Sequence, residues 1–489
     1  MPIKAYVFAL LALLCLPPIQ AHARTLAFSH LRRLANHGVA VSAEAVLLEH
    51  DRLLGSVDAG KRLTPASLTK LYTTAAALER WGPKHHFTTR LLTTASQDKG
   101  VLEGDIIFAG AGDPGLQARD LWQLAQNLNN RGIRRVTGRL IINQSRFGPV
   151  NCISEDRCHA HTHTAHAYNA LLSAAGVDYG NWCVSVIPAQ RAGRPAKAVP
   201  CHGQRGVVEI ANSVRTVSAS RSPWLKASRS TDQQGDTVRV SGRIPAGDQP
   251  QRIYLAASNP AHQTGRLLMR ILRTSGVRVD GGLSVQQSAL PADARTLAQV
   301  RGRPLQALLE RMLTYSNNYM ADTLALDLAH RSSPVQASLR DGGETLEAFA
   351  ASLKNARGMD PPPPVLLSGS GLTVQNRVSA RDLILLLRAM YHRPALFPAF
   401  LGALSVPQSS PMHMLKGGDS LWLKQVMVKT GSLNDPVSVL GVAGYFRTAS
   451  GRWGAFAALT NGTAAHPHVA WFKAMRAIED DVSELIARG

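Results

Sequence analysis

Acidic side chains are scarce in this sequence. Its 489 residues hold 33 Asp and Glu against 54 Lys and Arg, which gives a formal net charge of +21 at pH 7. This imbalance favours polyanionic partners. Charged residues make up only 18% of the chain and hydrophobic residues 45%, a balance that excludes an intrinsically disordered protein. Because the chain is too long for one ordinary core, we expect two or three domains.

Long hydrophobic runs are also missing beyond the N-terminus. The run Ala5–Leu16 is shorter than the roughly 20 residues that span a bilayer. Lys4 precedes it and the small residues Ala21 and Ala23 follow it, which is the pattern of a signal peptide. We expect residues 1–23 to be removed and the mature chain to be exported to the periplasm, soluble or loosely membrane-associated. The expected polyanions are then cell-wall polymers or a membrane surface, and no nucleic acid.

Cysteine is rare, and one of the five cysteines, Cys15, lies in the predicted signal peptide. The remaining four are Cys152, Cys158, Cys183 and Cys201, an even set that favours disulfides in an oxidising compartment. Three pairings are possible, and we favour the sequential one, Cys152–Cys158 and Cys183–Cys201. The close Cys-x-x-Cys pairs typical of zinc sites are absent from the sequence.

Histidines cluster at His159, His161, His163 and His166. On an extended strand the first three would share one face and could bind zinc or copper. We interpret the cluster as a solvated, pH-sensitive loop and keep metal binding as the alternative. We expect no metal or organic cofactor for the chemistry described below.

The segment Pro65–Leu78 predicts a buried helix with a nucleophile at its start. It is rich in Leu and Ala, and no Gly or Pro follows Pro65 before Gly82. Ser67 lies at the expected helix N-terminus, where unpaired N–H groups stabilise a developing negative charge. Lys70 follows one turn later on the same face, so its amine can accept the Ser67 proton. Ser67 and Lys70 are the predicted nucleophile and base.

Ser-x-x-Lys is a short pattern, and the chain holds a second copy at Ser96 and Lys99. That copy lies in a polar segment ending at Gly100, which predicts a solvated turn. Taken alone, Ser67 and Lys70 would more often be a helix cap and a surface amine. The assignment of a nucleophile therefore depends on the motifs that follow.

Two further motifs occur later in the chain. Ser316-Asn317-Asn318 lies inside a predicted long helix from Leu305 to His330, and Lys429-Thr430-Gly431 ends a predicted strand. With Ser67 and Lys70 they form the ordered trio of penicillin-binding proteins and class A β-lactamases. Ser316 is expected to relay a proton to the leaving amine, and Asn318 to hold the substrate amide.

The third motif is expected to serve both binding and catalysis. Burial and the Lys429 cation should together lower the pKa of Lys70. Lys429 and Thr430 would bind the terminal carboxylate of the substrate from a strand edge. Gly431 would let the substrate backbone approach that strand. Backbone N–H groups of Ser67 and Ser432 are the expected oxyanion hole.

The distance along the chain from Ser67 to Ser316 is far too long for one β-lactamase-like domain, so we expect the strand-rich block from residue 90 to residue 262 to fold within it. The sequence resembles the class C low-molecular-mass penicillin-binding proteins. These are the D-alanyl-D-alanine carboxypeptidase/endopeptidase family, also called the penicillin-binding protein 4 family and similar to peptidase family S13. The resemblance covers nearly the whole mature chain. The segments that carry it are Pro65–Lys70, Gly112–Pro114, Ala257–Pro260, Tyr315–Asn318, Gly369–Leu372 and Lys429–Leu433.

The resemblance implies an α/β multidomain fold with nested, β-rich inserted domains. The transpeptidase-like catalytic domain, an antiparallel sheet flanked by helices, would hold residues 24–91 and 263–489. Domain II would hold residues 92–165 and 240–262, and domain III residues 166–239. The implied function is serine-type D-Ala-D-Ala carboxypeptidase and DD-endopeptidase activity on peptidoglycan stem peptides, with covalent binding of β-lactam antibiotics.

This chain departs from the family pattern at several positions. Asn317 replaces the usual Asp, and Ser368 and Val374 replace an Asp and an Arg in a motif that helps recognise the stem-peptide side chain. The family's Trp- and Asp-containing motif is not recognisable, and residues 152–166 stand in its place. Side-chain preference is therefore open, and Asn434 could supply a neutral contact.

Two other functions are weighed against a DD-peptidase. A β-lactamase needs a dedicated carboxylate that activates water, and no residue of the sequence is identified for that role. A catalytically idle peptidoglycan-binding scaffold would use the basic surface and the inserted domains without the serine chemistry.

Overall fold

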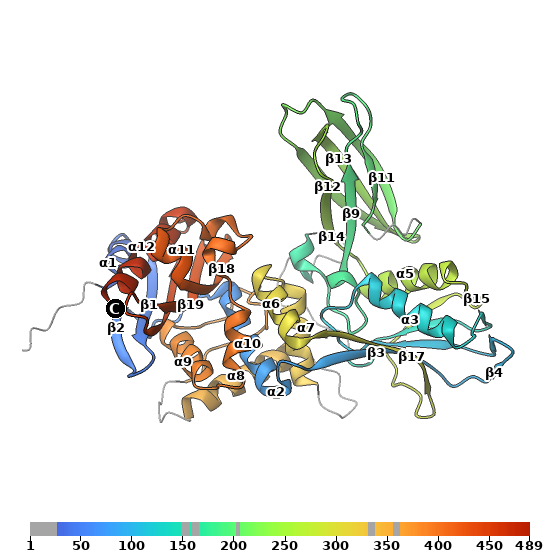
Figure 1. Ribbon diagram of the computed structural model, residues 1–489, viewed down its shortest axis with the longest axis horizontal. Coiled ribbons are helices and arrows are strands. Elements are labelled where there is room, and N and C mark those ends of the chain that lie inside the picture. Colours follow the sequence, from blue (N-terminus) through green and yellow to red (C-terminus); the bar gives the residue numbers. More distant parts are fainter. Residues whose placement is uncertain (1–26, 148–156, 159–165, 202–205, 331–337, 356–361) are drawn as a thin grey trace, which may run out of the picture.

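The computed structural model of this chain describes residues 27–147, 157–158, 166–201, 206–330, 338–355 and 362–489. Two lobes lie side by side, each around its own five-stranded sheet, and a third, β-rich unit stands upright beside the second lobe (Figure 1). The predicted α/β multidomain fold with β-rich insertions is confirmed. The predicted signal peptide lies outside the described residues. In the part of the chain that is described, none of the helices has both the length and the apolar character needed to cross a bilayer.

The first lobe holds an antiparallel sheet in the order β18-β19-β20-β1-β2. Its strands are β1 (Ala40–Leu47), β2 (Arg52–Val57), β18 (Val426–Leu433), β19 (Val439–Arg447) and β20 (Trp453–Asn461). Helices α1 (Ser29–Asn36), α11 (Ser420–Gln425) and α12 (Trp471–Arg488) pack on one face. The other face carries α2 (Lys70–Trp81), α6 (Leu305–Thr314), α7 (Asn318–Ala329), α8 (Leu339–Asn355), α9 (Ala380–Tyr391) and α10 (Phe397–Gly402). The two ends of the chain thus build one sheet.

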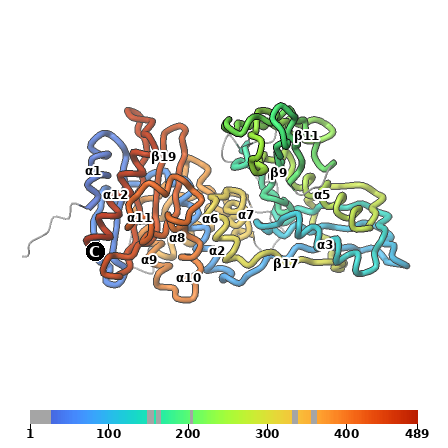
Figure 2. Tube along the Cα trace, turned by 45° about the horizontal axis from the view of Figure 1, so that its top comes forward, coloured from blue at the N-terminus to red at the C-terminus, as the bar shows by residue number. Residues whose placement is uncertain are grey.

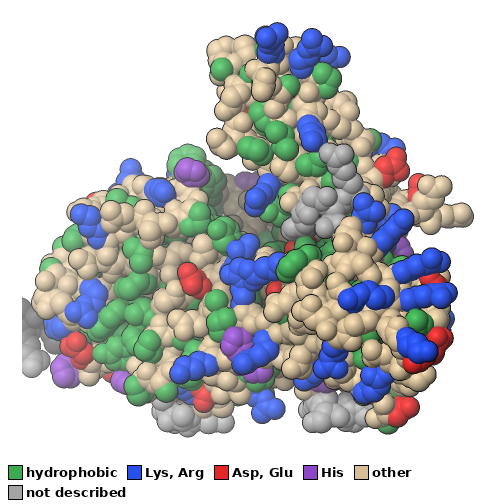
Figure 3. Space-filling view, turned by 45° about the vertical axis from the view of Figure 1, so that its right-hand side comes forward, with side chains coloured by type: hydrophobic (Ala, Val, Ile, Leu, Met, Phe, Trp, Pro, Cys, Tyr) green, Lys and Arg blue, Asp and Glu red, His purple; other side chains and the backbone are tan. Residues whose placement is uncertain are grey.

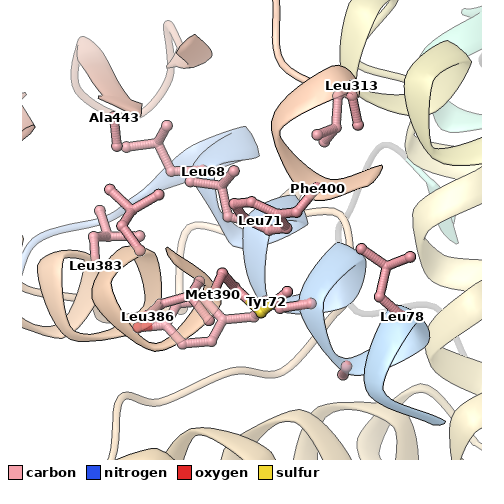
Figure 4. Close-up of a cluster of buried hydrophobic side chains, with 14 of the residues drawn as sticks. Leu68, Leu71, Tyr72, Leu78, Leu313, Leu383, Leu386, Met390, Phe400 and Ala443 are labelled. Carbon is pink, nitrogen blue, oxygen red and sulfur yellow. The ribbon is translucent and has the colours of Figure 1, made fainter. Parts of the chain in front are cut away.

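Helix α2 lies in the centre of the apolar core of this lobe. Its first turns bring Leu71 and Tyr72 against Met390 of α9 and Phe400 of α10 (Figure 4). The preceding Leu68 points toward Ala443 of β19. Fully burying one such side chain contributes about 1.5–3 kcal/mol. The segment that carries the predicted nucleophile is therefore held rigidly from several sides.

The second lobe holds a mixed sheet in the order β16-β8-β6-β3-β17. Its strands are β3 (His86–Thr93), β6 (Ile106–Ala109), β8 (Leu140–Asn143), β16 (Leu283–Gln286) and β17 (Arg295–Pro304). Helices α3 (Ala118–Asn130) and α5 (Pro260–Thr274) pack together in the same apolar cluster as this sheet. A small sheet extends it through β4 (Gln97–Asp98), β5 (Val101–Leu102), β7 (Arg135–Val136) and β15 (Arg278–Val279). Strands β3 and β17 pair within this sheet, and β17 continues into α6 of the first lobe (Figure 2).

The third unit holds two three-stranded sheets. Their strands are β9 (Asn181–Ile187), β10 (Lys197–Pro200), β11 (Glu209–Val217), β12 (Trp224–Asp232), β13 (Gly235–Pro245) and β14 (Gln251–Ala256). The predicted disulfide Cys183–Cys201 is present. Cys158 is disulfide-bonded as well, and its predicted partner Cys152 lies outside the described residues.

The predicted domain division remains a proposal, and the strand pairing favours moving two of its boundaries. Residue 263, the predicted return to the catalytic domain, lies inside α5, and β17 still pairs with β3 of the second sheet. Pairing also places β13 and β14, which run past residue 239, in the third unit. These strands belong to their sheets because of backbone hydrogen bonds. Backbone pairing leaves no motif in the sequence, so the sequence alone does not indicate these boundaries. With these boundaries moved to Pro304 and Ala256, the three-domain division remains a proposal.

The predicted single helix from Leu305 to His330 is wrong. Helix α6 ends at Thr314, Ser316 has a positive φ of 52°, and α7 begins at Asn318. The Asn317 side chain caps α7 by accepting a hydrogen bond from Met320 N at 3.0 Å. A polar side chain that bonds the backbone locally ends one helix and starts another, and the break turns Ser316 toward the cleft described next.

Candidate active site

The three predicted motifs line one cleft of about 820 Å³. Ser67 enters from the turn before α2, Ser316 and Asn318 from the break between α6 and α7, and Thr430 and Ser432 from β18. These segments are far apart in the sequence and meet only through the fold. The structure therefore brings together the residues that the motifs predicted.

Ser67 lies in a 3-10 turn, Ala66–Thr69, directly ahead of α2. Ala66 has a positive φ of 47°, a region that non-glycine residues seldom adopt. Thr69 Oγ1 donates to the Ala66 carbonyl at 2.9 Å and holds that strained backbone in place. The turn leaves the Ser67 hydroxyl half-buried at the cleft, while Leu68 beside it is fully buried.

The Lys70 amine is fully buried and faces three oxygen atoms. Its Nζ lies 2.8 Å from Ser67 Oγ, 2.7 Å from Asn318 Oδ1 and 2.7 Å from the Ser370 carbonyl. Two of these oxygens are carbonyl oxygens that can only accept hydrogen bonds. A neutral amine would donate to both and direct its lone pair at the Ser67 hydroxyl. The geometry therefore suits a base that accepts the proton of Ser67.

Burial and neighbouring cations favour the neutral form of Lys70. Burial, then the Lys429 ammonium and, less strongly, Arg157 lower the pKa of Lys70 well below its usual range, whereas Asp322 raises it. Burial also lowers the pKa of Lys429 to about 7. Two positively charged amines in one desolvated cleft would repel each other, which is energetically unfavourable. A neutral Lys70 beside a charged Lys429 is therefore the favoured arrangement.

Lys429 extends from β18 to the second serine. Its Nζ donates to Ser316 Oγ at 3.0 Å and to the carbonyl of Thr430 at 2.6 Å. Asn318 Oδ1 accepts a hydrogen bond from Lys70, and Asn318 Nδ2 donates one to the Tyr168 carbonyl at 3.2 Å. Ser67, Lys70 and Asn318 thus form one hydrogen-bonded group, and Ser316 with Lys429 forms a second on the same cleft.

Asp322 and Ser370 complete the surroundings of Lys70, and neither was assigned a role from the sequence. The fully buried Asp322 accepts from Ser370 N at 2.8 Å and from Arg157 Nη1 at 2.6 Å. Asp322 therefore holds the backbone N–H of Ser370, and the carbonyl of the same residue contacts Lys70. Asp322 follows Asn318 by one helical turn. An acidic residue at that spacing in an otherwise apolar helix is the sequence signal that could have indicated its role.

Gly431 is required by the nucleophile turn. A Cβ at this position would lie 2.6 Å from the Pro65 carbonyl oxygen and 2.9 Å from the backbone N of Ser67. Strand β18 can therefore contact the Ser67 turn only if residue 431 has no side chain. The prediction attributed Gly431 to close approach of a substrate, and the structure shows close approach of the chain itself.

The positions that depart from the family pattern have different surroundings. Ser368 is buried, and its Oγ accepts from Gly371 N at 3.1 Å. Val374 and Asn434 line the cleft. Ser96 and Lys99, the second Ser-x-x-Lys pair, are exposed and distant from this cleft in the fold. His166 is exposed and stacks on Tyr168, and the other three histidines of the cluster lie outside the described residues.

Comparison with known proteins identifies the family. Residues 31–482 match the D-Ala-D-Ala carboxypeptidase 3 (S13) family. A D-alanyl-D-alanine carboxypeptidase of Actinomadura sp. (strain R39) is 30% identical over 350 residues, which are 68% of this chain and 61% of that longer protein. D-alanyl-D-alanine carboxypeptidase DacB of Haemophilus influenzae is 23% identical over 445 residues, 89% of this chain and 88% of the relative.

A solved structure shows the same fold. Penicillin binding protein 4 from Haemophilus influenzae has a TM-score of 0.73 at 21% identity and covers 93% of this chain and 99% of its own. The resemblance drawn from the sequence motifs is confirmed. The chain belongs to the D-Ala-D-Ala carboxypeptidase 3 (S13) family, and it is a hydrolase of the serine-type D-Ala-D-Ala carboxypeptidase class.

Proposed function

We propose that Ser67 attacks the peptide carbonyl between the two D-Ala residues of a peptidoglycan stem. As the Oγ–carbon bond forms, the Ser67 proton passes to Lys70, and the oxyanion is held by the N–H groups of Ser67 and Ser432. The carbon–nitrogen bond then breaks, and a proton relayed through Ser316 leaves with the amine of D-Ala. Water hydrolyses the acyl-enzyme and regenerates Ser67. The observation that carries this proposal is the contact between Lys70 Nζ and Ser67 Oγ, made by a buried amine with a lowered pKa.

The substrate backbone would bind beside β18. This strand lies at the edge of its sheet, and an edge strand offers backbone N–H and C=O groups to an extended peptide. Lys429 and Thr430 would bind the terminal carboxylate, and the amide of Asn318 would hold the stem peptide. The same acylation would attach a β-lactam to Ser67, since a β-lactam carries a strained amide in place of the scissile peptide.

Endopeptidase cleavage of D-Ala–diaminopimelate cross-links is the proposed second activity, as the family resemblance implies. The resemblance supports export to the periplasm. The excess of basic side chains, spread over the face in Figure 3, supports contact with anionic wall polymers or a membrane surface. Stem peptides of peptidoglycan are the proposed substrate class.

The test measures release of D-Ala from a soluble stem peptide ending in D-Ala-D-Ala. We expect the wild-type protein to release D-Ala and Ser67→Ala to release none, while Ser96→Ala keeps the wild-type rate. The rival functions give other results. An idle scaffold would release no D-Ala in any form, and a β-lactamase would hydrolyse a chromogenic β-lactam rapidly without accumulating an acyl-enzyme. Release that persists in Ser67→Ala would contradict the proposal.

A further inference from the structure

A second cavity lies at the far end of the nucleophile helix. Its volume is about 670 Å³, and its wall includes Trp81, the last residue of α2, together with residues of β3 and β6. A helix rises 1.5 Å per residue, so Trp81 lies about 17 Å along α2 from Lys70. Segments after β8, β16 and α7 complete the wall, so both lobes contribute to it. The volume lies within the range of small-molecule sites.

The cavity wall is basic. It includes His85, His86, Arg90, Arg146 and His330, and no Asp or Glu occurs among the described residues that line it. The exposed Arg90 lies on β3. Arg146 Nε donates to the buried Asp327 at 2.6 Å, and a guanidinium carries four further N–H donors. Burial and neighbouring cations lower the pKa of both His85 and His330. The exposed Arg90 therefore supplies positive charge, Arg146 shares its charge with Asp327, and at neutral pH these histidines supply hydrogen-bonding nitrogens.

Aromatic rings form part of the same wall. Trp81 and His85 are stacked with centroids 5.4 Å apart, and the rings of Trp81 and Phe87 form a T-shaped pair with centroids 5.7 Å apart. Leu290, which is 38% exposed, adds an apolar contact from the segment after β16. The C–H face of a pyranose ring packs on aromatic surfaces, while its hydroxyl groups need polar partners at the edges. Gln287 and Ser145 supply polar side chains here.

Charge, shape and size together select one class of ligand. A small inorganic anion would satisfy Arg90 and Arg146 but leave the aromatic wall and most of the volume unused. An apolar ligand would bury the Arg90 guanidinium and offer it no hydrogen-bond partner, which is unfavourable. A cationic ligand would be repelled. A sugar that carries a carboxylate uses both the rings and the cations.

We propose that this cavity binds a carboxylated amino sugar of the peptidoglycan glycan strand. The lactyl carboxylate of such a sugar is free only where the stem peptide has been removed. The site would therefore hold a stem-free sugar at one end of α2 while a stem peptide on another sugar of the strand is processed at the other end, which raises the local concentration of stems near Ser67. The choice of polymer rests on the proposed function, whereas the ligand class rests on the cavity itself.

The test uses isothermal titration calorimetry with N-acetylglucosaminyl-N-acetylmuramic acid, whose lactyl carboxylate is free. N,N′-diacetylchitobiose is the matched neutral probe, and inorganic phosphate is the probe for an anion alone. We expect saturable binding of the acidic disaccharide and at least tenfold weaker binding of the other two. Arg90→Gln should weaken acidic disaccharide binding about tenfold, since a charge-assisted hydrogen bond contributes about 1.5 kcal/mol or more. Leu290→Asp should do the same by placing a negative charge on the wall.

Arg239→Gln is the matched control, because Arg239 is an exposed arginine on β13 of the third unit. Equal weakening by Arg239→Gln would mean diffuse attraction to a basic protein and would overturn the proposal. So would equal binding of chitobiose or phosphate, or no saturable binding at all. D-Ala release from the soluble stem peptide is measured on the same samples. If that release depends on Ser67 while the disaccharide does not bind, this inference fails and the proposed function stands.

Discussion

Two regions of this molecule share the pattern Ser-x-x-Lys and have opposite surroundings. Lys70 is fully buried, its amine contacts Ser67 at 2.8 Å, and a second buried lysine lies on the same cleft. Ser96 and Lys99 are exposed on a turn at β4, where Lys99 and Gly100 both have positive φ. Among the described residues, no side-chain hydrogen bond joins Ser96 to Lys99.

The comparison shows what a four-residue pattern does not specify. Both copies supply a hydroxyl and an amine, but only the first lies where the protein removes water and adds a neighbouring cation. Desolvation disfavours the charged amine, and like charge disfavours it further. We infer that the protein environment, and not the pattern alone, would make Lys70 a base, and the variants below test that environment one contact at a time.

Removing the amine should have the largest effect. Lys70→Met is expected to lower the second-order rate of acylation by a fluorescent penicillin about 10³-fold, since general-base catalysis contributes about 10² to 10⁴. Lys99→Met should leave the rate unchanged. Stopped-flow labelling of both variants measures this difference. A rate in Lys70→Met within threefold of wild type would show that another group accepts the Ser67 proton.

Removing the second cation should have the next largest effect and should also change the pH profile. For the wild type, kcat/KM should rise with pH as Lys70 loses its proton and fall above about pH 7 as Lys429 does. Lys429→Met should lower kcat/KM about 10²-fold through loss of the carboxylate contact. It should abolish the descending limb and move the ascending limb to higher pH, because Lys429 lowers the pKa of Lys70. The exposed Lys424→Met is the control. An unchanged ascending limb would contradict the coupling of the two amines.

A methyl group at the contact between β18 and the nucleophile turn should have a smaller effect. Gly431→Ala places a Cβ within 2.6 Å of the Pro65 carbonyl, so strand and turn must separate. Overpacking of this kind costs about 1–3 kcal/mol, and we expect acylation to slow about tenfold or more. Gly402→Ala, where an added Cβ meets no atom within 4 Å, is the matched control. Equal rates in the two variants would show that the contact does not align the site.

Removing the Asp322 carboxylate should have the smallest effect on the rate of acylation, and it should also shift the pH profile of kcat/KM. Asp322→Asn keeps an oxygen that can accept from Ser370 N but loses the charge-assisted part of that hydrogen bond, and we expect acylation to slow roughly fivefold, which corresponds to about 1 kcal/mol. Asp322 raises the pKa of Lys70, so its loss should move the ascending limb of kcat/KM to lower pH, opposite to Lys429→Met. Thermal unfolding of the variant separates this change from loss of structure. A limb that moves to higher pH would contradict the role given to Asp322.

Local sequence patterns predicted much of the fold and most of the site. The buried helix predicted within Pro65–Leu78 is present as the turn Ala66–Thr69 followed by α2, because the segment is rich in Leu and Ala and free of Gly and Pro after Pro65. The residues at 67, 70, 316, 318 and 430 were named from motifs and meet on one cleft or contact its lining. Here sequence and structure agree because the relevant interactions are local or carried by a motif.

The remainder could not be predicted because it depends on contacts between distant segments. Nothing in residues 295–304 indicates that they pair with β3. The break at Ser316 depends on Asn317 as a cap inside an apolar run that otherwise favours a continuous helix.

The most direct test of the account locates the acylated serine. The protein is incubated with a penicillin and digested, and the modified peptide is sequenced by mass spectrometry. The account predicts the adduct on Ser67, in the peptide that also holds Leu68 and Thr69, and none on the peptide that holds Ser96. An adduct on Ser96, or on any serine other than Ser67, would contradict the claim that burial beside a second amine makes this hydroxyl the nucleophile.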